Sequence, residues 1–250
     1  MRHWTYQRLS DLNRWIGRQL GRGYAGRRSL AVEAAAAAGF LRGDNSVVLD
    51  IGANQGHWSR ALLAVAGDRI ERIYGFEPMA EHREALGELD GERFELVAEA
   101  IGAKPGTVPI YAHRPGASIA SVYNRDVAHY GMTFSELAAV PMTTVDRFME
   151  RRGIDHVDFM KLDIEGHELA ALEGAEIALS EGRIGALSFE MGGCNIDART
   201  YLKDFWSFLH PRGFRLFIVN PLDGLHPIDS YHEAHENFLT ANFVAARGQA

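Results

Sequence analysis

The sequence predicts an α/β domain in which a mostly parallel, seven-stranded sheet carries helices on both faces, behind an N-terminal helical cap. From residue 46 onward, short apolar runs alternate with segments of helical periodicity, a pattern typical of a parallel sheet. The first apolar run leads through a turn bracketed by Gly52 and Gly56 straight into a helix. A chain of 250 residues with 46% hydrophobic content can bury one large core of this kind.

Two helices are expected before the sheet begins. Leu12, Trp15 and Ile16 repeat at helical spacing, and the alanine-rich stretch 32–38 has high helix propensity. Glycines between residues 21 and 26 separate the two segments.

The N-terminal segment is strongly basic, although the whole chain is acidic. Residues 1–28 hold seven arginines and one aspartate, a charge of +6, so the other residues must carry −13 to give the total of −7. Such arginines usually form the solvated face of a cap helix or of a helix that forms a dimer. In the second case the protein would be a homo-oligomer. The sharper alternative is contact with an anionic membrane or a lipid-linked substrate. We expect residues 1–42 to form a cap and residues 43–250 the main domain.

The strands and helices of the main domain follow from apolar runs and from helical spacing of apolar residues, each ended by glycine or proline. The expected strands span residues 46–51, 70–76, 94–98, 157–162, 184–189, 214–219 and 238–245. The expected helices span residues 56–66, 79–89, 144–152, 168–178 and 202–209.

The alternation breaks after Gly102. Residues 107–111 predict one additional strand, and residues 112–140 then show neither strand nor helix periodicity. Irregular stretches of this length are uncommon unless they are functional lids or disordered. We therefore expect 112–140 to be a substrate lid or an insertion.

Carboxylates follow most of the predicted strands. Ligands of open α/β sheets bind outside the carboxyl ends of the strands, and like charges gathered there need a partner, such as a cationic ligand, a ribose, a metal ion or a proton. The acids at these ends are Asp50, Glu77, Glu99, Asp163, Glu165 and Glu190.

The turn after the first strand predicts a ligand that carries both charges of an amino acid. Its spacing is G-x-x-x-G, led by Asp50, and not the G-x-G-x-x-G of a dinucleotide site. A zwitterionic amino-acid tail suits backbone N–H and C=O groups beside an acid. The candidate binding residues of this turn are Asp50, Gly52, Asn54 and Gly56.

Two further acids are candidates for the same ligand. Glu77 lies 27 residues after Asp50, consistent with an acid that binds the two hydroxyls of a ribose. The alternative for Glu77 is a solvated acid or a contact with the following helix. Glu99 is a candidate acceptor for an adenine amine, and the alternative is a surface glutamate before a turn.

The candidate catalytic side chains are concentrated in the segment from Asp163 to Glu168. Asp163 and Glu165 flank one residue and so face the same way in an extended chain. His167 is a candidate general base because its ordinary pKa is about 6.5, although histidines at helix starts are more often solvated. Glu168 falls in the first turn of a helix, where an acid is favoured in any case.

A divalent cation is a further candidate ligand. Asp163 and Glu190, with Glu165 as a third acid, offer the oxygen donors that hard cations prefer. No His or Cys pair has zinc spacing, so we expect no zinc site.

The composition limits which binding partners and which cellular compartment we expect for this protein. The charge of −7 argues against general affinity for nucleic acid. The single cysteine, Cys194, excludes an intramolecular disulfide and suits the reducing cytoplasm. We find no run of about 18 apolar residues and no apolar core of a secretory signal.

Several blocks of the sequence resemble the signature blocks of the FkbM-type methyltransferases. The similarity extends over about residues 45–245 and leaves residues 1–38 and 112–140 outside the signatures. The resembling blocks are Val48–Gly56, Tyr74–Pro78, Lys161–Glu168, Ser188–Glu190 and Glu236–Phe238.

The resemblance implies a Rossmann-like class I fold that binds S-adenosylmethionine (SAM). It also implies methyl transfer to a hydroxyl of a small-molecule or glycan acceptor, namely a sugar, a glycolipid or a polyketide. The candidate catalytic residues are then Asp163, Glu165 and His167, unless Asp163 instead binds the cofactor's amino group. Methylation of nitrogen in a protein, nucleic acid or small molecule, and a non-catalytic binding role, are the alternatives.

Overall fold

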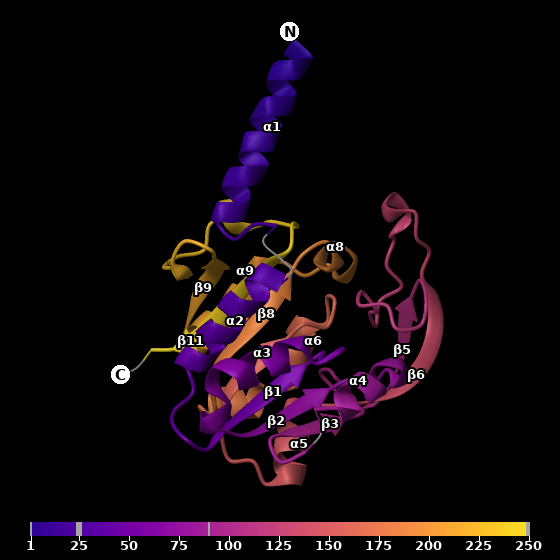
Figure 1. Ribbon diagram of the computed structural model, residues 1–250, viewed down its shortest axis with the longest axis vertical. Coiled ribbons are helices and arrows are strands. Elements are labelled where there is room, and N and C mark those ends of the chain that lie inside the picture. The colour runs from indigo at the N-terminus through magenta and orange to yellow at the C-terminus, as the bar shows by residue number, and fades with distance from the viewer. Residues whose placement is uncertain (1, 24–26, 90, 249–250) are drawn as a thin grey trace.

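The computed structural model describes residues 2–23, 27–89 and 91–248, and its centre is one large β-sheet (Figure 1). In the described residues this sheet has eight strands, in the order β10-β9-β11-β8-β7-β1-β2-β3. The strands are β1 (Ser46–Ile51), β2 (Ile70–Phe76), β3 (Phe94–Val97), β7 (Val157–Leu162), β8 (Ile184–Met191), β9 (Phe214–Asn220), β10 (Gly224–Ile228) and β11 (Ala241–Arg247).

The mostly parallel sheet predicted from the sequence is confirmed. The five strands from β8 to β3 are all parallel to their neighbours, and β11 is antiparallel to both β8 and β9. The eighth strand, β10, forms an antiparallel hairpin with β9 and was not expected. It is a short edge strand with Pro227 in it, so its sequence shows little strand pattern.

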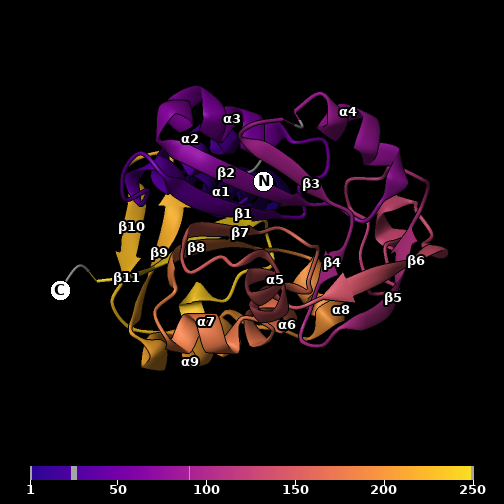
Figure 2. The same cartoon turned by 90° about the horizontal axis from the view of Figure 1, so that it is seen from below.

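Helices cover both faces of the sheet, as Figure 2 shows from below. Successive strand residues alternate between two cores: Val48 and Phe159 pack on one face, and Leu49 and Met160 on the other. On the first face lie α2 (Arg27–Gly39), α3 (His57–Ala66) and α4 (Arg83–Gly87). On the second lie α5 (Val145–Arg152), α6 (Glu168–Glu173), α7 (Glu176–Ser180) and α9 (Leu202–Leu209).

A second, three-stranded sheet stands beside the main one (Figure 1). It consists of β4 (Ala100–Ile101), β5 (Gly106–Ala112) and β6 (Ser135–Thr143) in the order β4-β6-β5. The expectation that 112–140 is irregular is therefore wrong from Ser135 onward. Alanines and Pro141 give β6 little local strand propensity, and its strand structure comes from antiparallel pairing with β5.

Other differences from the sequence-based expectations are local. The helix expected over 79–89 is a short 3₁₀ turn followed by α4, which ends at Gly87. The helix expected over 168–178 is split into α6 and α7 at Gly174. A Cβ at Gly174 would lie 2.1 Å from the carbonyl oxygen of Gly102, so this backbone contact needs a glycine. Helix α8 (Cys194–Ala198) was not expected.

Short 3₁₀ helices complete the described secondary structure. They are η1 (Gly67–Arg69), η2 (Ala80–His82), η3 (Ala128–Tyr130), η4 (His210–Arg212) and η5 (Glu233–His235).

The N-terminal helices differ in their contacts. Helix α2 packs beside α3, whereas α1 (Arg2–Gln19) projects from the body of the molecule (Figure 1). Part of the glycine-rich stretch that separates them, residues 24–26, lies outside the described residues. None of the helices described here is both long enough and apolar enough to cross a membrane.

We expect Gly174→Ala to lower the free energy of unfolding by about 1–3 kcal/mol or more, because the added methyl meets backbone that cannot move aside. The measurement is urea denaturation. The matched control is Gly106→Ala, where nothing lies within 4 Å of the added carbon and the change should stay within about 0.5 kcal/mol. Equal stability of the two variants would contradict the close contact.

Candidate functional site

The turn after β1 joins three strands at the carboxyl edge of the sheet. Gly52 has a φ of 87°, and the N–H groups of Gly52 and Ala53 both donate to the carbonyl of Phe76, each at 3.0 Å. A Cβ at Gly52 would lie 2.0 Å from the carbonyl oxygen of Asp163. Only glycine therefore allows the turn and the Asp163 loop to approach this closely.

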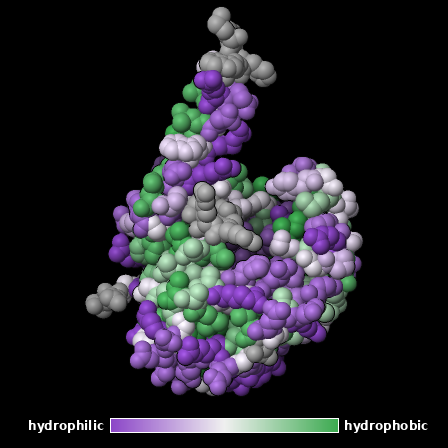
Figure 3. All heavy atoms as spheres, viewed as in Figure 1, coloured by the Kyte–Doolittle hydropathy of each residue, from purple (hydrophilic) through white to green (hydrophobic). Residues whose placement is uncertain are grey.

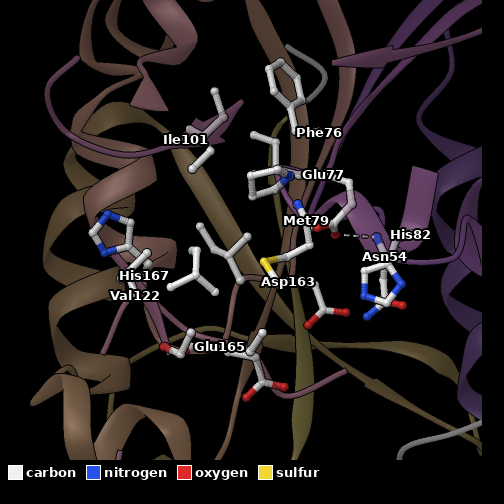
Figure 4. Close-up of a pocket in the computed structure, with 18 of the residues that line it drawn as sticks. Asn54, Phe76, Glu77, Met79, His82, Ile101, Val122, Asp163, Glu165 and His167 are labelled. Atoms are coloured by element: carbon white, nitrogen blue, oxygen red, sulfur yellow. Dashed lines mark hydrogen bonds between the residues drawn. The ribbon is translucent and has the colours of Figure 1, made fainter. Parts of the chain in front are cut away.

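At the end of β2, each carboxylate oxygen of Glu77 accepts a hydrogen bond from a backbone N–H group. The N–H of Asn54 donates to Oε2 at 3.0 Å, and the N–H of Met79 donates to Oε1 at 2.8 Å (Figure 4). The residue is only 6% exposed, and burial raises its pKa to about 7 against the effect of these hydrogen bonds. Each oxygen retains a lone pair that can accept a hydroxyl of a ligand.

Lys161 places a buried ammonium group among the carboxylates of the site. Its Nζ lies 3.0 Å from Asp163 and 3.7 Å from Asp50, and 5.9 Å from the ring centre of Trp58. Burial disfavours the charged form, but Asp163 and Asp50 raise the pKa of Lys161 above its ordinary value. The side chain is therefore a permanent cation that links β7 to β1.

Asp50 lies behind the turn. Its carboxyl group is fully buried, accepts a hydrogen bond of 2.6 Å from Ser59, and has its pKa raised by burial against the opposing charge of Lys161. Asp50 thus supports the turn from within the core.

The loop after β7 is held by Glu168. Its carboxylate accepts hydrogen bonds from the N–H of Ile164 at 2.9 Å and from the N–H of Gly166 at 3.0 Å. Two residues of this loop have positive φ, Glu165 at 54° and Gly166 at 106°. Glu168 is fully buried, which raises its pKa to about 7, and it fixes the turn that presents Glu165 and His167.

Glu165 joins this loop to the segment expected to be a lid. Arg125 Nη1 donates to Glu165 Oε2 at 2.6 Å, and Ser121 Oγ donates to the Glu165 carbonyl at 2.8 Å. The Arg125 guanidinium also contacts Asp197 of α8 at 3.4 Å. Burial and the neighbouring Asp163 raise the pKa of Glu165 to about 8, and Arg125 opposes the shift.

His167 pairs with the same segment. Its Nδ1 lies 3.1 Å from the hydroxyl of Tyr123, and burial lowers its pKa below the ordinary value, so the ring is neutral at physiological pH. Its Nε2 is buried beside Gly102 and has no hydrogen-bond partner among the described residues.

One pocket brings most of the predicted site residues together. Figure 4 shows Glu77 and Asn54 on one side of it, His167 and Val122 on the other, and the Asp163 carboxylate between them. The predicted residues that line it are Gly52, Asn54, Glu77, Glu99, Asp163, Glu165 and His167. Apolar side chains, including Ile51, Phe76, Met79 and Ile101, form the rest of the wall. Asp50, Gly56 and Glu190 do not belong to the lining.

Residues of the expected lid also line the pocket. Five of them, between Ala117 and Val122, contribute to its wall. His129 and Tyr130 lie instead in η3, with their rings tilted against each other and their ring centres 4.0 Å apart, and do not belong to the lining.

Glu99 lies at the rim of the pocket. Its carboxylate pairs with both terminal nitrogens of Arg151, one of them at 3.3 Å. An adenine amine would therefore meet a carboxylate that is already partly neutralised.

The residues expected to hold a divalent cation do not form a metal site. Within residues 2–23, 27–89 and 91–248, no three His, Cys, Asp or Glu side chains are arranged to hold a metal ion. The Lys161 ammonium occupies the position beside Asp163 that a cation would need. The pKa of Glu190 is raised by burial and by Asp163 and Glu165, so protonation lowers the negative charge there.

Sequence reasoning missed Lys161 and Arg125 as site residues. The signal for Lys161 was present: a lysine in the buried run 157–162 must find a carboxylate partner. Arg125 offered no local signal, because its partners Glu165 and Asp197 are 40 and 72 residues away in the chain.

We expect Lys161→Met to lower the free energy of unfolding by about 3–5 kcal/mol, because it leaves Asp50 as a buried charge without its partner. Urea denaturation measures the loss. The exposed lysine variant Lys104→Met is the matched control and should change little. Adding Asp50→Asn to Lys161→Met should restore part of the lost free energy of unfolding, because the buried charge is then removed as well. If Asp50→Asn instead lowered the stability of the Lys161→Met variant further, the pairing of Lys161 with Asp50 would be contradicted.

Comparison with known proteins gives the family. A family model described as the methyltransferase FkbM domain matches residues 50–216, more than half of the chain. A search of curated proteins gave no match.

Several solved structures are similar to this chain. A methyltransferase FkbM from Methylobacillus flagellatus KT has a TM-score of 0.53 and 19% identity, with 83% of this chain and 45% of that chain covered. An rRNA methylase from Streptococcus thermophilus has a TM-score of 0.45 and 15% identity, covering 87% and 95%. A precorrin-6y C5,15-methyltransferase from Geobacter metallireducens GS-15 has a TM-score of 0.44 and 11% identity, covering 86% and 87%.

The first of these likenesses confirms the Rossmann-like class I methyltransferase fold. This chain spans less than half the length of that protein. Because the FkbM-domain model covers most of the main sheet and the whole of the pocket loop from Asp163 to Glu168, the chain belongs to the FkbM family of methyltransferases.

Proposed function

We propose that this protein is a SAM-dependent O-methyltransferase that transfers a methyl group to a hydroxyl of a sugar, glycan, glycolipid or polyketide-type acceptor. The observation that carries the proposal is the single pocket in which the Gly52–Asn54 turn, Glu77 and the Asp163–His167 loop meet. Family membership supports methyl transfer, and the pocket residues support the donor.

The residues of this pocket fit the parts of SAM. Glu77 presents fixed carboxylate oxygens suited to two ribose hydroxyls. The turn that begins at Gly52 passes close to Asp163, whose carboxylate suits the ammonium group of the amino-acid end. Met79 and Ile101 form an apolar wall suited to adenine, with Glu99 at the rim as acceptor for its amine.

Bound SAM supplies a methyl group that is already strongly electrophilic, so the protein must orient the acceptor, exclude water and move one proton. Five residues between Ala117 and Val122 line the pocket and are placed to limit its contact with water. The groups that can take the hydroxyl proton are the carboxylates of Asp163 and Glu165 and the imidazole of His167. Asp163 has the most exposed carboxylate of the site acids in this loop, at 38%, and so is the best placed to contact a ligand directly.

An oxygen acceptor is favoured over a nitrogen acceptor by the residues after β7. Enzymes that methylate nitrogen in proteins or nucleic acids often carry Asn/Asp-Pro-Pro-aromatic there, and this chain has Asp163-Ile164-Glu165-Gly166. The acceptor itself can be sought by comparing the glycans and secondary metabolites of cells with and without the gene. The product gains the mass of one methyl group in place of a hydrogen.

We expect Glu77→Ala to weaken SAM binding by about 10- to 100-fold, because a fixed, buried carboxylate loses hydrogen bonds to two hydroxyls. Isothermal titration with SAM measures the affinity. The matched control is Glu81→Ala, an exposed acid close in sequence, which should bind as the wild type does. No SAM binding to the wild type, or equal affinity of both variants, would overturn the donor assignment.

We expect at least one of Asp163→Asn, Glu165→Gln and His167→Ala to lower turnover at saturating SAM by about 10²- to 10⁴-fold, the usual range for loss of a general base. Wild-type turnover in all three would show that the proposed catalytic set is wrong. The dependence of turnover on pH separates two of the candidates. If Glu165 is the base, turnover falls as the pH drops below about 8, because its pKa is raised to about 8. If His167 is the base, turnover falls only below the ordinary histidine pKa of about 6.5, because burial lowers its pKa.

A further inference from the structure

Helix α1 carries an apolar stripe that faces solvent. The stripe consists of Leu9, Leu12, Ile16 and Leu20, which repeat at three- and four-residue steps, with Tyr6 at its border. These side chains are 42–71% exposed, although they would ordinarily be expected in a core. Figure 3 shows the helix standing clear of the body with apolar and hydrophilic side chains along it.

The opposite face of the helix is basic. Arg14 and Arg18 lie there, and Arg14 pairs with Asp11, the single acid of the helix. Arg8 and Trp15, which is 60% exposed, lie between this face and the stripe. A helix with low overall hydrophobicity, arginines on one face and leucine and isoleucine on the other is the type that lies in a membrane interface.

The base of α1 lies at the same edge of the sheet as the pocket. Strand β9 runs in the same direction as β8, since both are antiparallel to β11, so Asn220 marks the carboxyl edge. Gly21 lies directly against Val219 of this edge, where an added Cβ would be 2.3 Å from the carbonyl oxygen, and Gly23 N–H donates to Thr240 at 2.7 Å.

Loops at this edge expose further apolar side chains. Leu239 is 55% exposed and lies next to Gly23 at the base of the helix. Eleven of the fourteen large hydrophobic side chains that are exposed among the described residues lie on α1, at Leu20 beside it, on α8 or in these loops. Ile196 lies on α8, and the loop residues are Tyr201, Leu222, Phe238 and Leu239.

We propose that α1 and the adjacent apolar loops dock this protein on an anionic lipid membrane surface. The apolar stripe enters the interface between headgroups and acyl chains, and Arg8, Arg14 and Arg18 bind the anionic headgroups. The rest of the chain carries −13 and would be repelled by the same surface, so a basic helix that projects from the body is the part suited to contact it. This inference does not depend on the proposed methyl transfer.

The alternative occupant is a second copy of the chain. Pairing of two stripes would bury the apolar residues, but it would give the basic charge of the helix no role. An anionic surface accounts for the stripe and for the charge together, and for this reason we favour it.

The test is flotation of the full chain with vesicles of phosphatidylcholine alone and of phosphatidylcholine mixed with phosphatidylglycerol. We expect binding to the mixed vesicles only, and weaker binding as salt screens the charges. The double variant Leu9→Glu/Ile16→Glu, on the stripe, should lose at least about tenfold of the bound fraction. The matched control Gln7→Glu/Ser10→Glu adds the same two charges on the arginine side, away from the stripe, and should lose clearly less binding than the stripe variant because the apolar residues remain.

Thermal unfolding confirms that both variants remain folded, as their position on a projecting helix predicts. Failure of the wild type to float with anionic vesicles would overturn the proposal, as would equal loss in the stripe and control variants. A dimer in light scattering that Leu9→Glu/Ile16→Glu dissociates, without vesicle binding by the wild type, would assign the stripe to a second copy instead.

Discussion

The buried ammonium group of Lys161 is the contact on which the site depends. It lies within 3.7 Å of Asp50 under the β1 turn and within 3.0 Å of Asp163 after β7, so one cation holds two adjacent strand ends together. Its charge also opposes the rise in the pKa of Glu33 on α2, whose carboxylate accepts a hydrogen bond of 2.8 Å from Asn242. Without Lys161, several carboxylates would be buried at one sheet edge with no positive partner, at a large cost in stability.

The second sheet and its loop complete the site from outside the main fold. Arg125 and Ser121 bind Glu165, and Tyr123 binds His167, so three residues of this segment contact the loop after β7. The segment that lines the pocket therefore also holds the two candidate catalytic groups in place.

Negative and positive side chains are concentrated in two different parts of the molecule. Acids gather around the pocket, where a cationic ligand and a buried lysine can balance them, and arginines gather on α1, which projects from the body. Because both features lie at the carboxyl edge of the sheet, a surface bound by α1 would face the same edge as the site. That arrangement suits an acceptor with a lipid part, one of the acceptor classes considered.

The sequence by itself determined the parallel sheet, its helices and the acids that follow the strands, because these depend on local periodicity and on glycines such as Gly52. It also determined that Glu77, Asp163, Glu165 and His167 lie at one edge, since parallel strands end together. Tertiary structure alone decided strand β6, whose alanine- and proline-containing sequence becomes a strand only by pairing with β5. It alone decided the pairing of Arg125 with Glu165 and the place of Asp50 behind the pocket, because contacts between residues tens of positions apart leave no local pattern in a sequence.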